Sequence, residues 1–107
     1  MPDQINILVI DDEQIMREGC SRILSKGGWD VLCAENGKQG LDEIQRLLGQ
    51  IDIVLLDLMM PGMNGMEVLD RLQGIDPNLL VIVITGYATV ESAVEAMKKG
   101  AYDFISK

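Results

Sequence analysis

Short apolar runs alternate along the chain with stretches in which apolar residues recur every three or four positions. The runs are rich in β-branched residues, which is typical of strands buried on both faces of a parallel sheet. Each run is also too short for a helix of ordinary length. Five runs share this character and are predicted to be strands: residues 5–10, 29–34, 51–56, 79–84 and 102–106.

The stretches between the runs have the spacing of amphipathic helices. Asn36 and Thr89 stand where the N-caps of two of them are expected. A glycine follows the last turn of each stretch, as is typical of the residue that ends a helix. Four helices are predicted, over residues 16–26, 37–48, 66–73 and 90–99.

Regular alternation of strands and helices predicts an α/β fold with a parallel sheet. Right-handed crossovers then place helices on both faces of the sheet. We therefore predict a doubly wound, flavodoxin-like sheet of five strands in the order 2-1-3-4-5. At 107 residues, the chain has the length of one domain.

The composition is that of a globular protein with an excess of acidic residues. Apolar residues make up 48% of the chain, charged residues 24%, and the net charge is −8 at pH 7. This balance argues against direct contact with the phosphate backbone of nucleic acids. The sequence shows neither a signal-peptide pattern nor an apolar stretch of about 20 residues. We therefore expect a cytoplasmic protein that does not associate with membranes.

Histidine and cysteine limit the possible chemistry. The chain has no histidine, which excludes histidine-based acid–base catalysis and histidine metal ligation within it. Cys20 and Cys33 both fall in apolar patterns and form no closely spaced pair. We expect them to be free, buried thiols rather than a disulfide.

Polar residues stand where four of the five predicted strands end. In a parallel α/β sheet these ends meet at one edge, and binding sites form there. Singly, each residue could be an ordinary loop, cap or surface residue, but together they match the needs of phosphoryl transfer. They are Asp11 and Asp12 after the first strand, Asp57 after the third, Thr85 after the fourth and Lys107 after the fifth.

Each residue type has a task in that chemistry. Carboxylate oxygens without histidine or cysteine suit Mg²⁺, which would neutralise charge on the transferring group. Asp57 follows a central strand and is the best-placed nucleophile, giving an acyl phosphate. Lys107 and the hydroxyl of Thr85 could bind phosphoryl oxygens. The backbone N–H groups of Leu58 and Met59 could also point at the anion.

Three segments carry a resemblance to a known family: ILVIDDE, DIVLLDLMMPGMNGMEVL and VIVITGYATVESAVEAMKKGAYDFISK. Over essentially its whole length the chain resembles the receiver domains of bacterial response regulators. It is most similar to receivers of nitrogen-regulator-class transcription activators. The resemblance implies that a sensor histidine kinase supplies the phosphoryl group from a phosphohistidine. It also implies an output domain in a longer parent protein, with transcription as the expected output.

The resemblance assigns roles to individual positions. Asp57 is the implied phospho-acceptor, and Thr85 and Lys107 contact the phosphoryl oxygens. The implied ligands of Mg²⁺, with Mn²⁺ as an alternative, are Asp11, Asp12, Asp57 and the backbone carbonyl of Met59. The domain would catalyse only its own phosphorylation and slow dephosphorylation, so it is not expected to be an enzyme acting on an external substrate.

Four further positions are implied to act in switching and in the lifetime of the acyl phosphate. Thr85 would move toward the phosphoryl group, and Phe104 would enter the space that Thr85 leaves; the alternative is that Phe104 simply fills the core. Met59 and Tyr87 lie two residues after Asp57 and Thr85 and would overhang the phosphoryl group. Neither side chain can orient an attacking water, so we expect slow self-dephosphorylation.

The chain departs from the family in one respect, because members normally continue past this lysine with a proline and a fifth helix. We therefore expect residues 1–107 to be a receiver domain without its final helix. Apolar surface should then be exposed near the first and fifth strands. Self-association, such as a homodimer, or reduced stability would follow.

Three alternatives differ in class. An aspartyl-nucleophile phosphatase of the haloacid dehalogenase type would have a second aspartate two residues after the nucleophile, where this chain has Met59. A receiver-like interaction module that has lost phosphorylation would lack one of the site residues, and none is missing. A flavin-binding flavodoxin would need a Ser/Thr/Gly-rich phosphate loop after the first strand, in place of Asp-Asp-Glu.

Overall fold

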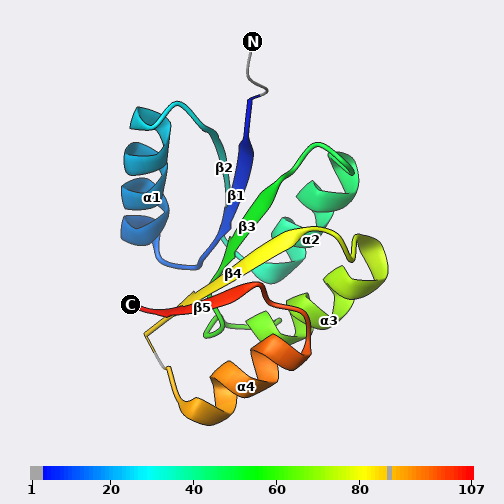
Figure 1. The fold of residues 1–107 in the computed structure, drawn as a ribbon. Helices are drawn as coiled ribbons and strands as arrows, with labels where there is room; N and C mark the ends of the chain where they lie inside the picture. The colour runs from blue at the N-terminus through cyan, green and yellow to red at the C-terminus, as the bar shows by residue number, and fades with distance from the viewer. Residues whose placement is uncertain (1–3, 87) are drawn as a thin grey trace.

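A computed structural model describes residues 4–86 and 88–107, and it contains one parallel sheet flanked by helices (Figure 1). The elements in chain order are β1 (Asn6–Ile10), α1 (Gln14–Lys26), β2 (Asp30–Ala34), α2 (Gly37–Arg46), β3 (Ile53–Leu56), α3 (Gly65–Ile75), β4 (Leu80–Thr85), α4 (Val90–Lys98) and β5 (Asp103–Ser106). The strand order is β2-β1-β3-β4-β5, and every neighbouring pair is parallel. The predicted α/β class and the predicted strand order are confirmed.

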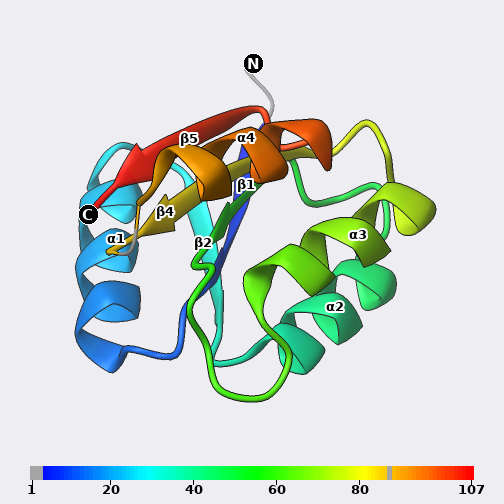
Figure 2. The ribbon, with the colours of Figure 1, turned by 90° about the horizontal axis from the view of Figure 1, so that it is seen from below.

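The two faces of the sheet are covered by different numbers of helices. Figure 2 shows α1 on one side of the sheet and α2 and α3 on the other. An ion pair between Asp70 of α3 and Lys99, which follows α4, links α4 to the same side. Among the described residues, three helices therefore lie on one face of the sheet and α1 on the other.

The main core lies between the sheet and these three helices. Alternate residues of the central strands point toward the helices, as the two-residue period of a strand requires. Together with side chains from α2 and α3, they form a cluster of almost fully buried residues. Its most buried members include Leu8, Ile10, Val54, Leu56, Val81, Val83, Ile44, Leu69 and Leu72.

The face covered by α1 leaves apolar side chains exposed. No residue of α1 is buried, and Ile15 and Ile23 are 83% and 71% exposed. On the sheet itself, Leu55 and Ile84 are only half-buried, and Ile105 of β5 is 45% exposed. Apolar surface is therefore exposed near the fifth strand, as expected, but not at the first strand, where Ile7 and Val9 are only 5% and 2% exposed. Self-association through it stays a prediction.

The boundaries of α3 and the burial of one cysteine differ from the expectations. The helix passes Gly74 and ends at Ile75, because Asp76 precedes Pro77 and a residue before proline disfavours the helical conformation. Cys20 and Cys33 are free, as predicted, but Cys20 is only half-buried. The prediction that Cys33 is buried is wrong: it is exposed because β2 is an edge strand with no neighbour beyond it.

The start of α3 lies directly against the end of β3. Asn64 caps this helix by accepting a hydrogen bond from the backbone N–H of Glu67. The backbone N–H of Gly65 donates to the carbonyl of Leu58 at 3.0 Å. A Cβ atom at Gly65 would lie 2.5 Å from the carbonyl oxygen of Asp57 and 2.6 Å from the Cα of Leu58. Only glycine lets the helix start this close to the segment that carries Asp57.

This contact predicts opposite effects for two glycine-to-alanine changes in α3. Gly65→Ala should lower the free energy of unfolding by about 1–3 kcal/mol, because the new methyl group meets backbone that cannot easily move. Gly74→Ala, whose Cβ would have nothing within 4 Å, should raise it by about 0.5–1 kcal/mol through higher helix propensity. Denaturant unfolding of both variants measures the difference. Equal stabilities would contradict this view of the β3–α3 junction.

Candidate functional site

An acidic pocket lies where β1, β3 and β5 end. Asp11 and Asp57 are each 4% exposed, whereas Asp12 is exposed. One carboxylate oxygen from each of these three residues lies within 4.8 Å of the other two. The hollow beside them has a volume of about 350 Å³ and is also lined by Lys107. The convergence expected from the strand ends is therefore present.

Backbone hydrogen bonds hold the two buried carboxylates in place. The N–H of Asp57 donates to the carbonyl of Ile10 at 3.0 Å, which ties the end of β3 to the end of β1. The N–H of Met59 donates to Asp57 Oδ1 at 3.2 Å. The N–H of Glu13 donates to Asp11 Oδ1 at 2.9 Å. The strand ends and the turns after them thus fix both side chains before any ligand binds.

Lys107 is the cation of this pocket. Its Nζ lies 2.8 Å from Glu13 Oε1, 3.1 Å from Asp11 Oδ2 and 3.5 Å from Asp57 Oδ2. Burial alone would lower the pKa of Lys107, but its hydrogen bonds to Glu13 and Asp11 and the charge of Asp57 outweigh it, so the pKa is raised. Lys107 therefore stays protonated at neutral pH.

The surroundings of Asp57, in contrast, disfavour the charged form of its side chain. Burial raises the pKa of its carboxyl group above the ordinary value, and the charges of Asp11 and Asp12 raise it further. The N–H of Met59 and the charge of Lys107 act against this rise without cancelling it. The pocket thus holds more negative charge than Lys107 balances, which favours an additional cation.

The oxygen cluster fits Mg²⁺. Two ligands of an octahedral ion with bonds of about 2.1 Å lie about 3–4.2 Å apart. A small movement of the three carboxylates toward one another would therefore let one oxygen of each bind the same ion. Oxygen donors in a site without histidine or cysteine are those that Mg²⁺ prefers. Asp11, Asp12 and Asp57 could hold the ion directly. The carbonyl of Met59 as a fourth ligand stays a prediction.

The remaining predicted residues lie around the pocket or just behind it. Thr85 is fully buried at the end of β4, and its carbonyl accepts a hydrogen bond from the N–H of Lys107 at 2.9 Å. Phe104 lies opposite Val83 on β5, half-buried and packed against the core. Met59 lines the pocket and is 54% exposed. Tyr87 lies outside the described residues.

Two residues near the pocket were not assigned a role from the sequence. Glu13 lines the pocket and makes the shortest of the ion pairs of Lys107. Its position directly after Asp11 and Asp12 was the feature of the sequence that could have indicated a role in the pocket. Arg17 of α1 donates from Nη1 to the carbonyl of Asp11 at 2.7 Å and supports the turn after β1. No motif pointed to it.

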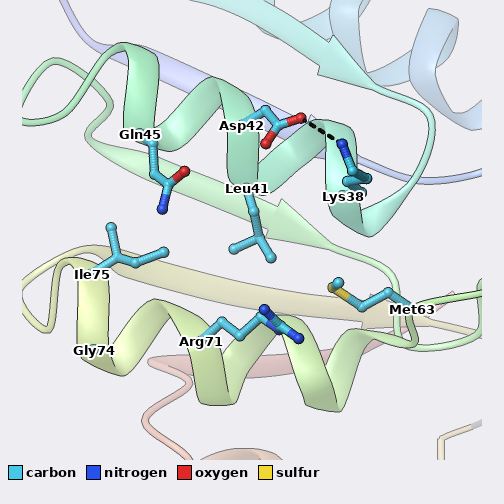
Figure 3. Close-up of a pocket in the computed structure, with 8 residues that line it drawn as sticks. All are labelled: Lys38, Leu41, Asp42, Gln45, Met63, Arg71, Gly74 and Ile75. Carbon is cyan, nitrogen blue, oxygen red and sulfur yellow. Dashed lines mark hydrogen bonds and ion pairs between the residues drawn. The ribbon is translucent and has the colours of Figure 1, made fainter.

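A second hollow lies between α2 and α3 and has a volume of about 500 Å³ (Figure 3). Leu41 of α2 points toward α3 in this view, and Lys38 and Asp42 form an ion pair of 3.4 Å along α2. None of the residues of the acidic pocket lines this hollow. It is therefore not part of the candidate site.

Comparison with known proteins identifies the family. Residues 7–107 match the family described as the response regulator receiver domain, and the chain belongs to it. Receiver domains are signalling modules of two-component systems, and they bind Mg²⁺ at an acidic pocket. Phosphorylation and control of an output are general to the family. No helix among residues 4–86 and 88–107 has both the length and the apolar character needed to cross a membrane.

The relatives include receivers of several kinds of protein. The chain is 34% identical to a cyclic di-GMP phosphodiesterase of Thermotoga maritima, over 96% of this chain and 27% of the relative. It is 35% identical to the transcriptional regulatory protein ZraR of Escherichia coli, over 98% of this chain and 23% of the relative. The chain thus spans about a quarter of the length of these curated relatives.

Solved structures confirm the fold. The structure of a CheX-CheY-BeF3-Mg+2 complex from Borrelia burgdorferi matches with a TM-score of 0.93 and 29% identity, covering 96% of this chain and 78% of that chain. The five-stranded sheet in the order 2-1-3-4-5 is therefore that of a CheY-like receiver.

The oxygen cluster predicts that Mg²⁺ stabilises the folded protein. Free Mg²⁺ at ten times its dissociation constant should raise the free energy of unfolding by about 1.4 kcal/mol, because the unfolded chain has no such site. Asp12→Asn should remove most of this gain, since it takes away one proposed ligand. Asp42→Asn, which removes the same charge from an exposed position on α2, is the matched control.

Thermal unfolding with and without Mg²⁺ measures the effect. A Tm of the wild type that does not respond to millimolar Mg²⁺ would contradict the metal site, and so would an equal response of wild type and Asp12→Asn.

Proposed function

We propose that this chain is a phosphorylated receiver in which Asp57 accepts the phosphoryl group of a phosphohistidine on a sensor histidine kinase. An oxygen of the Asp57 carboxylate attacks phosphorus, the P–O bond forms as the P–N bond breaks, and the histidine leaves as neutral imidazole after taking a proton. The observation that supports this most strongly is the convergence of Asp11, Asp12, Asp57 and Lys107 at one edge of the sheet.

The residues of the pocket would have different roles in this transfer. Mg²⁺, held by Asp11, Asp12, Asp57 and the carbonyl of Met59, would neutralise charge on the phosphoryl oxygens. Lys107 already lies 3.5 Å from Asp57 Oδ2 and would pair with a phosphoryl oxygen after transfer. The hydroxyl of Thr85 would donate to another. Asp57 is held by the N–H of Met59, so the attacking oxygen is positioned before the donor arrives.

Switching would follow from the new charge on Asp57. Thr85 moves toward the phosphoryl group, and Phe104 turns from its half-buried place on β5 into the space that Thr85 leaves. A differential stabilisation of a few kcal/mol is enough to invert a two-state equilibrium, and a charge-assisted hydrogen bond with an ion pair is about that large.

The surface of α4 and β5 would transmit the change. Val90, Val94 and Met97 are exposed on α4 and recur at helical spacing, so they form one apolar stripe. Tyr102, just before β5, is 66% exposed. Movement of Phe104 behind this surface would alter what it binds. An output domain in a longer parent protein is the expected recipient, and control of transcription is the output we favour.

The wider setting is proposed on the same basis. Residues 1–107 would form a receiver domain in a cytoplasmic protein that acts only on its own phosphorylation state. The acidic net charge of −8 argues against direct contact of this domain with nucleic acid. The cognate kinase and output are separate proteins or domains. A homodimer would form through the exposed apolar face, and an interaction module without phosphorylation is the alternative function.

Phosphorylation of Asp57 distinguishes the two functions. With Mg²⁺ and acetyl phosphate, the wild type should gain the mass of one phosphoryl group, in a form that hydroxylamine removes, because an acyl phosphate is labile to it. Asp57→Ala should gain no phosphoryl group. Asp42→Ala, which removes an exposed carboxylate on α2 outside the pocket, should behave as the wild type does. Intact-protein mass spectrometry measures this. An unmodified wild type would favour the interaction module, and a modified Asp57→Ala would assign the phosphoryl group elsewhere.

The position after the acceptor predicts the lifetime of the acyl phosphate. Met59 is exposed over the pocket and cannot orient a water molecule, so self-dephosphorylation should be slow. Met59→Asn should accelerate it severalfold, since an amide can hold water near phosphorus. Met59→Leu, which keeps an apolar side chain, should leave the rate unchanged. Decay of the phosphorylated protein after removal of donor measures the rate. Equal decay of wild type and Met59→Asn would show that Met59 does not matter.

A further inference from the structure

The side chain of Glu13 competes with Asp11 and Asp57 for the ammonium group of Lys107. Of the three carboxylates around Lys107 Nζ, Glu13 is the nearest, at 2.8 Å, and it accepts a hydrogen bond there. Asp11 and Asp57 lie at 3.1 Å and 3.5 Å. The ammonium group has three N–H donors, and three acceptors already surround it. When Asp57 becomes an acyl phosphate, its negative charge lies on the phosphoryl oxygens, and Lys107 must move toward them against its closer contacts with Glu13 and Asp11.

The other two partners differ in how easily they can give up Lys107. The side chain of Asp11 is only 6% exposed, so water cannot easily take the place of Lys107 beside it. The side chain of Glu13 is 60% exposed and can be hydrated at once. Glu13 is thus the partner that the phosphoryl group would replace.

Glu13 also adds negative charge to the mouth of the pocket. It lines the hollow together with Asp12, Asp57 and Lys107, through which an anionic donor would approach. Its backbone N–H, not its side chain, binds Asp11. A change confined to the side chain therefore leaves the hydrogen bond that shapes the acidic cluster.

We infer that Glu13 holds Lys107 away from the phosphoryl position and so sets how readily Asp57 enters the phosphorylated state. Glu13 is a positioning residue, because it acts through Lys107 and need not touch the transferring group. The inference rests on the proposed function.

Glu13→Gln tests the inference, because glutamine keeps the shape of the side chain and loses its charge. At saturating Mg²⁺, beryllofluoride, which mimics the phosphoryl group, should bind Glu13→Gln about two- to fivefold more tightly than the wild type, the effect expected of one exposed ion pair. Glu18→Gln removes the same charge from the next turn of α1 and should bind as the wild type does. Glu13→Asp, which restores the charge, should recover the wild-type affinity at least in part. Titration calorimetry measures all four proteins.

A double-mutant cycle separates this role from a general effect of charge. In a Lys107→Ala background, Glu13→Gln should no longer tighten binding, because there is no ammonium group left to release. An equal gain in both backgrounds would overturn the inference, and so would equal affinity of Glu13→Gln and the wild type. If wild type binds beryllofluoride, Asp57→Ala does not, and Glu13→Gln matches wild type, only this inference fails. If wild type itself does not bind, the proposed function fails with it.

Discussion

The site depends on an imbalance of charge confined to one edge of a parallel sheet. The ends of β1 and β3 place Asp11 and Asp57 side by side in a nearly buried pocket, with Asp12 beside them. Lys107 is shared among three carboxylates and cannot neutralise all of them. Carboxylates in such surroundings repel one another more strongly than in water, because the effective dielectric constant is lower. A divalent cation relieves that repulsion, and the pocket is then ready to accept a second anion. The proposed chemistry and the proposed switch both follow from this imbalance.

The hydrophobic pattern predicted the fold because each signal was local and consistent. The five runs became strands within about two residues of their predicted limits, and Asn36 and Thr89 cap α2 and α4 as expected. The convergence of Asp11, Asp12, Asp57 and Lys107 followed from topology, since the ends of parallel strands share an edge. The strand pattern alone thus placed residues together that lie far apart in the sequence.

The features that the sequence did not reveal depend on side-chain direction and on neighbouring elements. The pairing of Glu13 with Lys107 joins the first and last strands and requires both side chains to turn toward one point. The exposure of Cys33 depends on β2 lying at the edge of the sheet, which a local apolar pattern does not show. Helix α3 extends past Gly74 because Pro77, rather than the glycine, determines where it ends. The uneven covering of the sheet, in which α1 is the one helix that the described residues place on its face, was inferred only through the family resemblance.

The central claim is that Asp11, Asp12 and Asp57 bind one divalent cation together. A crystal of the protein grown with Mn²⁺, measured at a wavelength where manganese scatters anomalously, tests this most directly. The account predicts a strong anomalous peak in direct coordination distance of all three carboxylates. A crystal soaked with Mn²⁺ that shows no peak there, or a peak bound only by other residues, would contradict it.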